Sequence, residues 1–207
     1  MGKPKALVSF CGAPLIYRSL ERLAPIANQL IITTTDSASL DSIRIDAVDT
    51  SGRKPELHTD VHPTRGALSG IYTALYYASQ PAVAIVACDM VFPSAPIILA
   101  ELKLLQETGS DLVIPKTSHG FEPFHAVYRK ASCLPAVKAA LDRGEVRASG
   151  WYDAIKVLEF SHADVLAADP RGGSFINVNT PAELASLEQR FLAGEISAKT
   201  PSINQEQ

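Results

Sequence analysis

The sequence contains no long apolar run. Although 46% of its 207 residues are apolar, no stretch approaches the roughly 20 consecutive apolar residues that a transmembrane helix needs. The amino-terminal residues MGKPKA contain no apolar segment typical of a secretory signal peptide. Ala6 also stands where N-myristoylation would require Ser or Thr. We therefore expect no membrane partner.

Positive charge and cysteine are also scarce. The chain has 19 Lys and Arg against 22 Asp and Glu, so its net charge of −3 argues against nucleic acid as a partner. Its three cysteines, Cys11, Cys88 and Cys133, are an odd number at spacings that match no zinc or haem pattern. We expect free thiols in a reducing cytoplasm. A small phosphorylated ligand is compatible with this composition, because a few local cations are enough to bind it.

Short strand-like runs alternate with helical periodicities along the chain. This alternation predicts an α/β fold, with a mostly parallel sheet and helices on both faces. We expect a single domain over residues 1–195, followed by a loose polar tail at residues 196–207. Predicted strands cover residues 29–35, 83–87, 111–115, 124–129, 155–160 and, more briefly, 175–178, and predicted helices cover residues 14–23, 68–75, 97–105 and 181–192.

The stretch PAVAIVACDMVFP places Asp89 directly after an apolar run, residues 83–87. Such a run is typical of a strand buried on both faces, and ligands bind at the carboxyl ends of such strands. A carboxylate there suits Mg²⁺, which commonly takes one or two carboxylates together with phosphate oxygens. Because Asp is also favoured in turns and caps, a purely structural role for Asp89 stays open.

Three further features have both a functional and a structural interpretation. RGALSGI places Gly66 and Gly70 at the start of a predicted helix, where glycine allows a phosphate to approach free N–H groups or allows close packing. Asp60 lies just before this motif and either accepts hydrogen bonds from a nucleoside or occupies a surface turn. Lys5 is either a phosphate-binding charge or a solvated lysine.

The remaining polar candidates are weaker. NVNTP places Asn177 and Asn179 just before a predicted helix, which Thr180 is expected to cap, with Pro181 in its first turn. His125 lies in an alternating strand pattern, where a lone histidine is more often structural than catalytic.

Taken together, these motifs resemble the molybdenum cofactor guanylyltransferases. MGKPKALVSFCGAPLIYRSLERL, TDVHPTRGALSGIYTAL, VACDMVFP, EPFHAVYRKASCLP and FINVNTPAEL occur in the family's order, over nearly the whole chain. The resemblance implies a three-layer Rossmann-like nucleotidyltransferase fold. It also implies transfer of GMP from GTP to the phosphate of molybdopterin, with release of pyrophosphate and with Mg²⁺ as cofactor. GTP and molybdopterin would be the partners, with transient contact to molybdoenzymes or cofactor chaperones.

The resemblance also implies roles for individual residues. Asp89 would be a catalytic residue and metal ligand that faces the nucleotide phosphates, with the amide of Asn179 as a second ligand. Lys5 would be catalytic and bind phosphate. Asp60, Thr33, Gly66 and Gly70 would bind the nucleotide, although Thr33 replaces an asparagine of some family members and Ala67 replaces the proline of the family's GPLAG loop.

The family's first strand and its glycine-rich loop, of the form L-A-G-G-x-S-x-R-M-G-x-x-K, are matched only at their end, by Met1, Gly2 and Lys5. We therefore expect that Met1 corresponds to the methionine inside this motif and that the natural chain begins earlier. Without that strand, its two neighbours should present unpaired edges, and the chain should be less stable and bind GTP poorly. Two alternatives stay open: a transferase that uses another nucleotide such as CTP, and a degenerate homologue that binds without catalysis.

Overall fold

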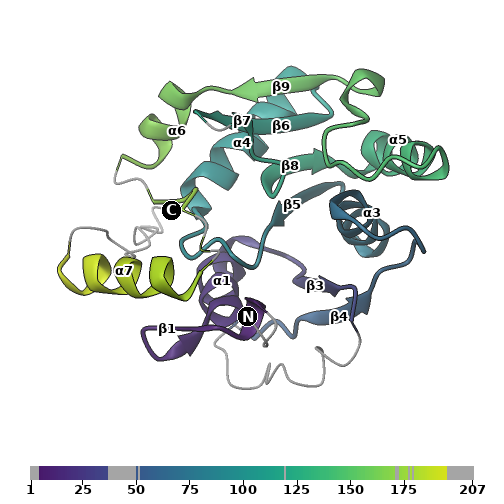
Figure 1. Cartoon of the computed structure of the whole chain (residues 1–207). Helices are drawn as coiled ribbons and strands as arrows, with labels where there is room; N and C mark the ends of the chain where they lie inside the picture. Colours follow the sequence, from purple (N-terminus) through teal and green to yellow (C-terminus); the bar gives the residue numbers. More distant parts are fainter. Residues whose placement is uncertain are drawn as a thin grey trace.

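The computed structural model describes residues 5–36, 50, 52–118, 120–170, 173–176, 178 and 180–194. Strands and helices alternate along these residues, as the sequence predicts (Figure 1). The polar tail expected at residues 196–207 lies outside the described residues. The strands are β1 (Ser9–Phe10), β2 (Ala13–Pro14), β3 (Ile31–Thr34), β4 (Glu56–Thr59), β5 (Ala82–Val86), β6 (Leu112–Thr117), β7 (Gly120–Phe121), β8 (His125–Arg129) and β9 (Val157–Phe160).

The helices follow the predicted periodicities and add two that were not predicted, α5 (Lys130–Asp142) and α6 (His162–Ala168). The last helix, α7 (Pro181–Leu192), begins as predicted, because Thr180 and Glu183 form a reciprocal capping box and Pro181 occupies the first turn. None of the described helices is long and apolar enough to cross a membrane. The α-helices are α1 (Leu15–Leu23), α3 (Ala67–Tyr77), α4 (Ala95–Thr108), α5 (Lys130–Asp142), α6 (His162–Ala168) and α7 (Pro181–Leu192).

The main sheet has the strand order β5-β8-β6, with β9 and the short β7 also paired to β6. Helices α3 and α5 pack on one face of this sheet and α4 and α6 on the other, which confirms the α/β class with helices on both faces (Figure 1). On the first face, Trp151 stacks on Tyr128, and both side chains are buried.

The strand directions differ from the expectation of a mostly parallel sheet. Among the described pairings, β3–β4 and β6–β9 are parallel, whereas β5–β8, β6–β8, β6–β7 and β1–β2 are antiparallel. The physical reason is the short connection after β6: β8 follows after residues 118–124, which include the short strand β7, and so short a connection can join only antiparallel neighbours. β8 then inserts between β5 and β6 and runs against both.

The strand predicted over residues 175–178 is wrong for the residues that the structure describes. The N–H of Ile176 closes a turn by donating to the carbonyl of Gly173. Phe175 packs its ring 5.2 Å from that of His125, and Val178 joins the cluster under α7. The apolar residues therefore fill gaps between elements without needing strand geometry.

β3 and β4 form a separate two-stranded sheet that does not pair with β5 in the described part of the chain (Figure 1). Among the residues that the structure describes, β3 and β5 each have one edge without a strand partner, in agreement with the unpaired edges expected from the sequence. The expectation that the run at residues 83–87 is buried on both faces is wrong: Ile85 is buried, but Ala84 is exposed and Val83 and Val86 are only half-buried.

Candidate active site at the strand ends

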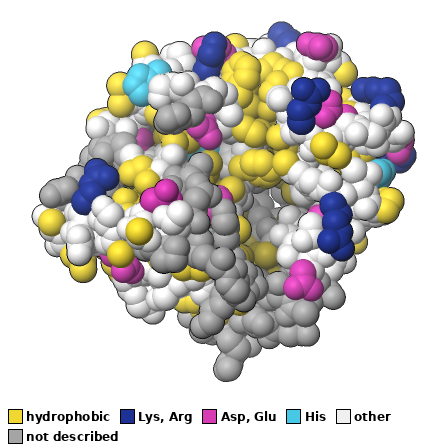
Figure 2. Space-filling view, in the orientation of Figure 1, with side chains coloured by type: hydrophobic (Ala, Val, Ile, Leu, Met, Phe, Trp, Pro, Cys, Tyr) yellow, Lys and Arg dark blue, Asp and Glu magenta, His cyan; other side chains and the backbone are white. Residues whose placement is uncertain are grey.

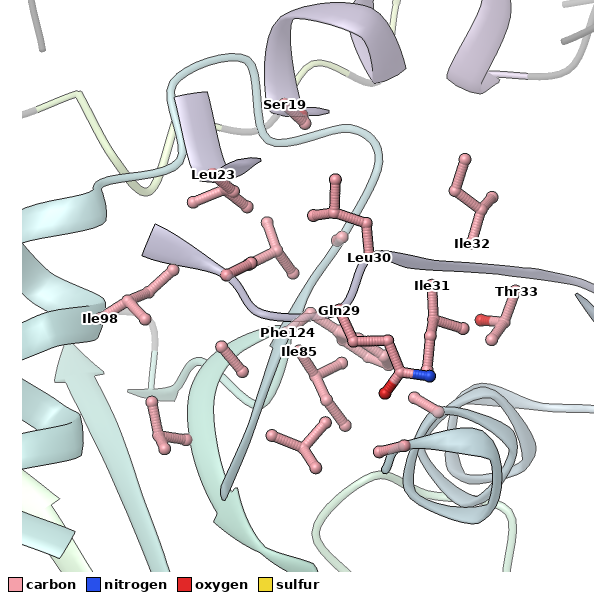
Figure 3. Close-up of a pocket in the computed structure, with 18 of the residues that line it drawn as sticks. Ser19, Leu23, Gln29, Leu30, Ile31, Ile32, Thr33, Ile85, Ile98 and Phe124 are labelled. Carbon is pink, nitrogen blue, oxygen red and sulfur yellow. The ribbon is translucent and has the colours of Figure 1, made fainter. Parts of the chain in front are cut away.

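A cleft with a volume of about 900 Å³ lies between β3 and β5 (Figure 3). Its walls come from both strands and from α1, α3 and α4. Figure 2 shows hydrophobic side chains gathered around a hollow on this face of the molecule. Three of the predicted site residues, Thr33, Gly70 and Asp89, line the cleft. The fold therefore brings together residues that are far apart in the sequence.

Asp89 occupies a turn just beyond the carboxyl end of β5, as predicted. The N–H of Ala87 donates to Phe124 and the N–H of Met90 donates back to Ala87, so the turn is closed on both sides. The residues that follow, Met90 to Phe92, are buried. A half-exposed carboxylate is thus held on a turn that its buried neighbours anchor.

Asp60 lies at the end of β4, beside the end of β3. Its N–H donates to the carbonyl of Thr34, and its carboxylate accepts from the hydroxyl of Thr73 at 3.2 Å. Partial burial raises the pKa of Asp60, and the hydrogen bond from Thr73 opposes this rise. Asp60 does not line the cleft itself, but its neighbour Thr34 does. Asp60 is therefore joined by its backbone to a residue of the cleft lining, and its carboxylate is held by Thr73 of α3.

The two glycines of the α3 motif have different surroundings. Gly66 caps α3 with φ = 147°, and a Cβ there would lie 3.2 Å from the Cβ and carbonyl oxygen of Val146. The N–H of Leu68 donates to that same carbonyl oxygen, so one helix-start amide is already used within the protein. A Cβ at Gly70 would have nothing within 4 Å. Gly66 therefore permits close packing, whereas Gly70 leaves open space in the cleft wall.

Two predicted site residues are not placed. Asn179 lies outside the described residues, as does Asn177, and the structure gives the backbone of Lys5 in a short 3₁₀ helix but not its side chain. Their proposed roles in binding phosphate and metal stay predictions.

The described lining of the cleft carries no positive charge. Its charged residues are Asp89 and Glu122, and the remaining lining is mainly aliphatic. Glu122 accepts a hydrogen bond from Thr117 at 2.9 Å. Among the described lining residues, none supplies a cation for a triphosphate.

Sequence reasoning missed two residues that organise this region. Thr73 bonds Asp60 and accepts from the N–H of Val61 at 3.1 Å. Gln29 bridges the starts of β3, β4 and β5, with hydrogen bonds to Glu56 and Ser79. Thr73 is one of two buried polar residues of α3, together with Ser69, and the sequence shows only that a threonine stands in a mainly apolar helix. Gln29 gives no local signal, because its partners are distant in the sequence.

His125 has a structural role, as its strand position suggested. Its Nε2 atom accepts a hydrogen bond of 3.0 Å from the N–H of Ser94, the residue that caps α4. Complete burial lowers the pKa of His125 to about 4. The side chain is therefore neutral at physiological pH and fixes the start of α4.

The cysteines are free thiols, as predicted. Burial raises the pKa of the Cys133 thiol to about 12, which makes it unreactive. Cys88, beside Asp89, is exposed. The described residues hold no cluster of three or more His, Cys, Asp or Glu that could bind a metal by themselves. The donor set here is instead one carboxylate, which suits a cation that also takes oxygen ligands from its substrate.

Comparison with known proteins identifies a matching family and similar relatives. Residues 1–159 match the family of the MobA-like NTP transferase domain. A molybdenum cofactor guanylyltransferase from Desulfosudis oleivorans is 30% identical over 196 residues, which cover 95% of this chain and 91% of the relative. The similarity thus extends over almost the whole length of both chains.

Solved structures share the fold. The molybdopterin-guanine dinucleotide biosynthesis protein A from Archaeoglobus fulgidus superposes with a TM-score of 0.77 at 24% identity, over 93% of this chain and 92% of that one. The 2-C-methyl-D-erythritol 4-phosphate cytidylyltransferase from Thermus thermophilus superposes with a TM-score of 0.61 at 15% identity, over 90% and 92%. The fold alone therefore does not identify the nucleotide.

Proposed function

Because this chain belongs to the family of the MobA-like NTP transferase domain, we propose that it transfers GMP from GTP to molybdopterin in the biosynthesis of the molybdenum cofactor. The products are molybdopterin guanine dinucleotide and pyrophosphate. The relative from D. oleivorans, which is similar over almost its whole length, supports this assignment. The observation that carries it is the position of Asp89 at the end of β5, in one cleft with Thr33 and Gly70.

The reaction needs no protein nucleophile. A phosphate oxygen of molybdopterin forms a bond to the α-phosphorus of GTP, and the bond between the α-phosphorus and the bridging oxygen to the β-phosphorus breaks. Pyrophosphate leaves with that oxygen and its electron pair. The protein acts by positioning the two phosphates and by balancing charge that shifts to the leaving group.

We assign Mg²⁺ to Asp89, with Asn179 as a further candidate ligand. Bound there, Mg²⁺ would neutralise negative charge on the phosphates. Lys5 supplies a second positive charge on the same groups. A site with a single described carboxylate fits a cation that takes most of its ligands from phosphate and water.

The nucleotide-binding residues divide between the base and the phosphates. We assign the base edge to Asp60, because a carboxylate accepts from both N1–H and the exocyclic amino group of guanine. Thr33 offers a hydroxyl from β3, and the open space at Gly70 lets the nucleotide approach α3 closely. Gly66 contributes to nucleotide binding by setting the start of α3 against Val146. The free thiols fit a reaction in the cytoplasm. There the product passes to molybdoenzymes or cofactor chaperones through transient contact.

Turnover of GTP, CTP and ATP, measured as pyrophosphate release with molybdopterin and Mg²⁺, tests the assignment. We expect GTP to be preferred at least about tenfold, because a site that hydrogen-bonds one base leaves polar groups unpaired with another. A preference for CTP would favour the cytidylyl alternative, which the shared fold of the T. thermophilus enzyme keeps open. Binding of GTP without turnover of any nucleotide would favour the non-catalytic alternative.

A further inference from the structure

Two fully buried polar side chains, Ser69 and Thr73, lie one turn apart on α3 and hold the segment that follows β4. The hydroxyl of Ser69 donates to the carbonyl of His62 at 3.3 Å. The hydroxyl of Thr73 accepts from the N–H of Val61 at 3.1 Å and donates to the carboxylate of Asp60 at 3.2 Å. Three consecutive residues are therefore fixed against α3 by two side chains that are shielded from water.

The position of the Thr73 hydroxyl is set from three directions. Its oxygen also lies 2.9 Å from the carbonyl oxygen of Ser69, one turn earlier in the helix. A hydroxyl has one proton to donate and two lone pairs that accept, so the Ser69 carbonyl and the Asp60 carboxylate share the proton while the oxygen accepts from Val61. The carboxylate is thus held by an atom that is itself held by the helix and by the neighbouring N–H.

Asp60 is also held through its backbone. Its N–H donates to the carbonyl of Thr34, at the end of β3, at 3.1 Å. Burial raises the pKa of Asp60 and the hydrogen bond from Thr73 lowers it, so Thr73 favours the ionised form. An ionised carboxylate has about four acceptor sites, and a carboxylate held through Oδ1 keeps sites for two further donors. Asp60 is therefore oriented and charged before a ligand binds.

The donors on the base edge decide which nucleotides such a carboxylate can bind. Guanine presents N1–H and the 2-amino group side by side, hypoxanthine presents N1–H alone, and adenine presents an acceptor at N1. An ionised carboxylate only accepts. Two parallel hydrogen bonds to its two oxygens require one fixed orientation, whereas a single hydrogen bond tolerates rotation. A carboxylate that is fixed in advance therefore gains most with a base that has both donors.

We propose that Thr73 is a positioning residue for the nucleotide: its hydroxyl fixes the Asp60 carboxylate so that the site selects purine nucleotides that carry a 2-amino group. The inference rests on the proposed function, because it takes Asp60 as the group that binds the base edge. It adds discrimination between GTP and inosine triphosphate (ITP), which differ only in the 2-amino group. Without the hydroxyl, the carboxylate can rotate about its bond to Cβ, and the second hydrogen bond is weakened.

The test compares GTP and ITP as substrates of the whole chain, with molybdopterin and Mg²⁺, by pyrophosphate release. In the parent, kcat/KM for GTP should exceed that for ITP at least about tenfold, because ITP loses a hydrogen bond to a charged group. Thr73→Val keeps the branched shape without the hydroxyl and should lower this ratio at least about threefold. The KM for GTP should rise while kcat stays within about twofold, since the reaction takes place at the phosphates.

A rescue and a matched control separate this role from a general effect on the fold. Thr73→Ser restores the hydroxyl and should recover most of the ratio. Ser69→Ala removes the other fully buried hydroxyl of α3, which bonds the carbonyl of His62, and should leave the ratio within about twofold of the parent. Melting temperatures show whether each variant folds. A merely structural role of Thr73 would lower kcat/KM for GTP and ITP by the same factor and overturn the proposal.

The possible outcomes also separate this inference from the proposed function. If the parent prefers GTP and Thr73→Val keeps the full ratio, the inference is wrong and guanylyl transfer stands. An equal loss of the ratio in Ser69→Ala also overturns the inference, because the effect would then belong to the whole segment rather than to the carboxylate. A parent that uses GTP and ITP equally removes the role of Asp60 at the base edge and the role of Thr73 with it.

Titration calorimetry of GTP and ITP with Mg²⁺ extends the test to a chain that binds without turnover. The ratio of the two dissociation constants should fall in Thr73→Val, recover in Thr73→Ser and stay nearly constant in Ser69→Ala, by the factors given above. A ratio that Thr73→Val leaves unchanged overturns the inference even where no transfer occurs. Binding of neither nucleotide to the parent overturns both the inference and the proposed function.

Discussion

At the scale of single residues, Asp89 is expected to be necessary for the reaction but not for folding. Its turn is held by backbone hydrogen bonds of Ala87 and Met90 and by the buried residues that follow it. We expect Asp89→Asn to preserve the melting temperature within a few degrees and to lower guanylyl transfer by on the order of 100-fold or more, because it removes charge that opposes the triphosphate.

Glu122→Gln is the matched control for this prediction. Glu122 is the other acidic residue of the cleft lining, but it bonds Thr117. The Glu122→Gln variant should keep a nearly normal rate of guanylyl transfer. If Asp89→Asn turns over GTP within a few-fold of the parent, the assignment of Asp89 to metal and phosphate is wrong.

Glu101 is a residue whose charge the fold disfavours. It lies on α4, fully buried, and neither carboxylate oxygen has a hydrogen-bond partner among the described residues. Burial raises its pKa well above the ordinary value of 4.5. The folded chain therefore keeps a proton that the unfolded chain releases, and the free energy of unfolding falls as the pH rises from about 4.5 through the raised pKa.

Two variants of Glu101 test this sign. Glu101→Leu should raise the free energy of unfolding at pH 7 by about 1 to 3 kcal/mol, the usual cost of a buried polar group without a partner. Glu101→Gln should abolish the decline between pH 5 and neutral pH that the carboxyl causes. Urea titrations across this pH range measure both effects. If the free energy of unfolding of the parent chain changes with pH in the same way as that of Glu101→Gln, the prediction is wrong.

At the scale of elements, the start of α3 gives a matched pair of glycines. Gly66→Ala should destabilise the chain by about 1 to 3 kcal/mol, because φ = 147° is unfavourable for alanine and the new Cβ would press against Val146. Gly70→Ala should stabilise it by about 0.5 to 1 kcal/mol, since alanine is the better helix former and its Cβ meets open space. Thermal unfolding measures the stability of both variants. If both substitutions change the stability equally, the φ angle and the space for a Cβ at the two glycines do not determine the effect.

Long or strongly periodic elements could be predicted from the sequence. The apolar runs of β3 and β5 and the periodic faces of α1, α3 and α4 are local signals, and the structure confirms them. β4 was missed because ELHT has no apolar run, and α5 was missed because Pro135 lies inside it. The direction of β8 depends on the short connection before it, which a strand pattern does not reveal.

The site shows the same division between local and distant signals. Asp89 could be predicted because it directly follows an apolar strand. Thr73 and Gln29 could not, since their roles come from Asp60, Ser79 and Glu56, which the fold brings to them.

At the scale of the whole molecule, the chain has two parts, the β3–β4 sheet and a main part built on the sheet of β5, β6, β7, β8 and β9. The β3–β4 sheet has no strand pairing to the main sheet in the described residues, and Gln29 is a direct link between them. The single tryptophan, Trp151, is buried in the main part against Tyr128. Its fluorescence therefore reports the main part, whereas far-UV circular dichroism reports both.

We expect the two signals to separate on unfolding by urea. Circular dichroism should begin to change at a lower urea concentration than tryptophan fluorescence, because the β3–β4 part loses its structure first. Gln29→Ala should widen this separation, since it removes hydrogen bonds to Ser79 that contribute about 0.5 to 1.5 kcal/mol each. Gln189→Ala, at an exposed position of α7, should leave the separation unchanged. Coincident transitions in the parent and in Gln29→Ala would show that packing across the cleft already couples the two parts into one cooperative unit.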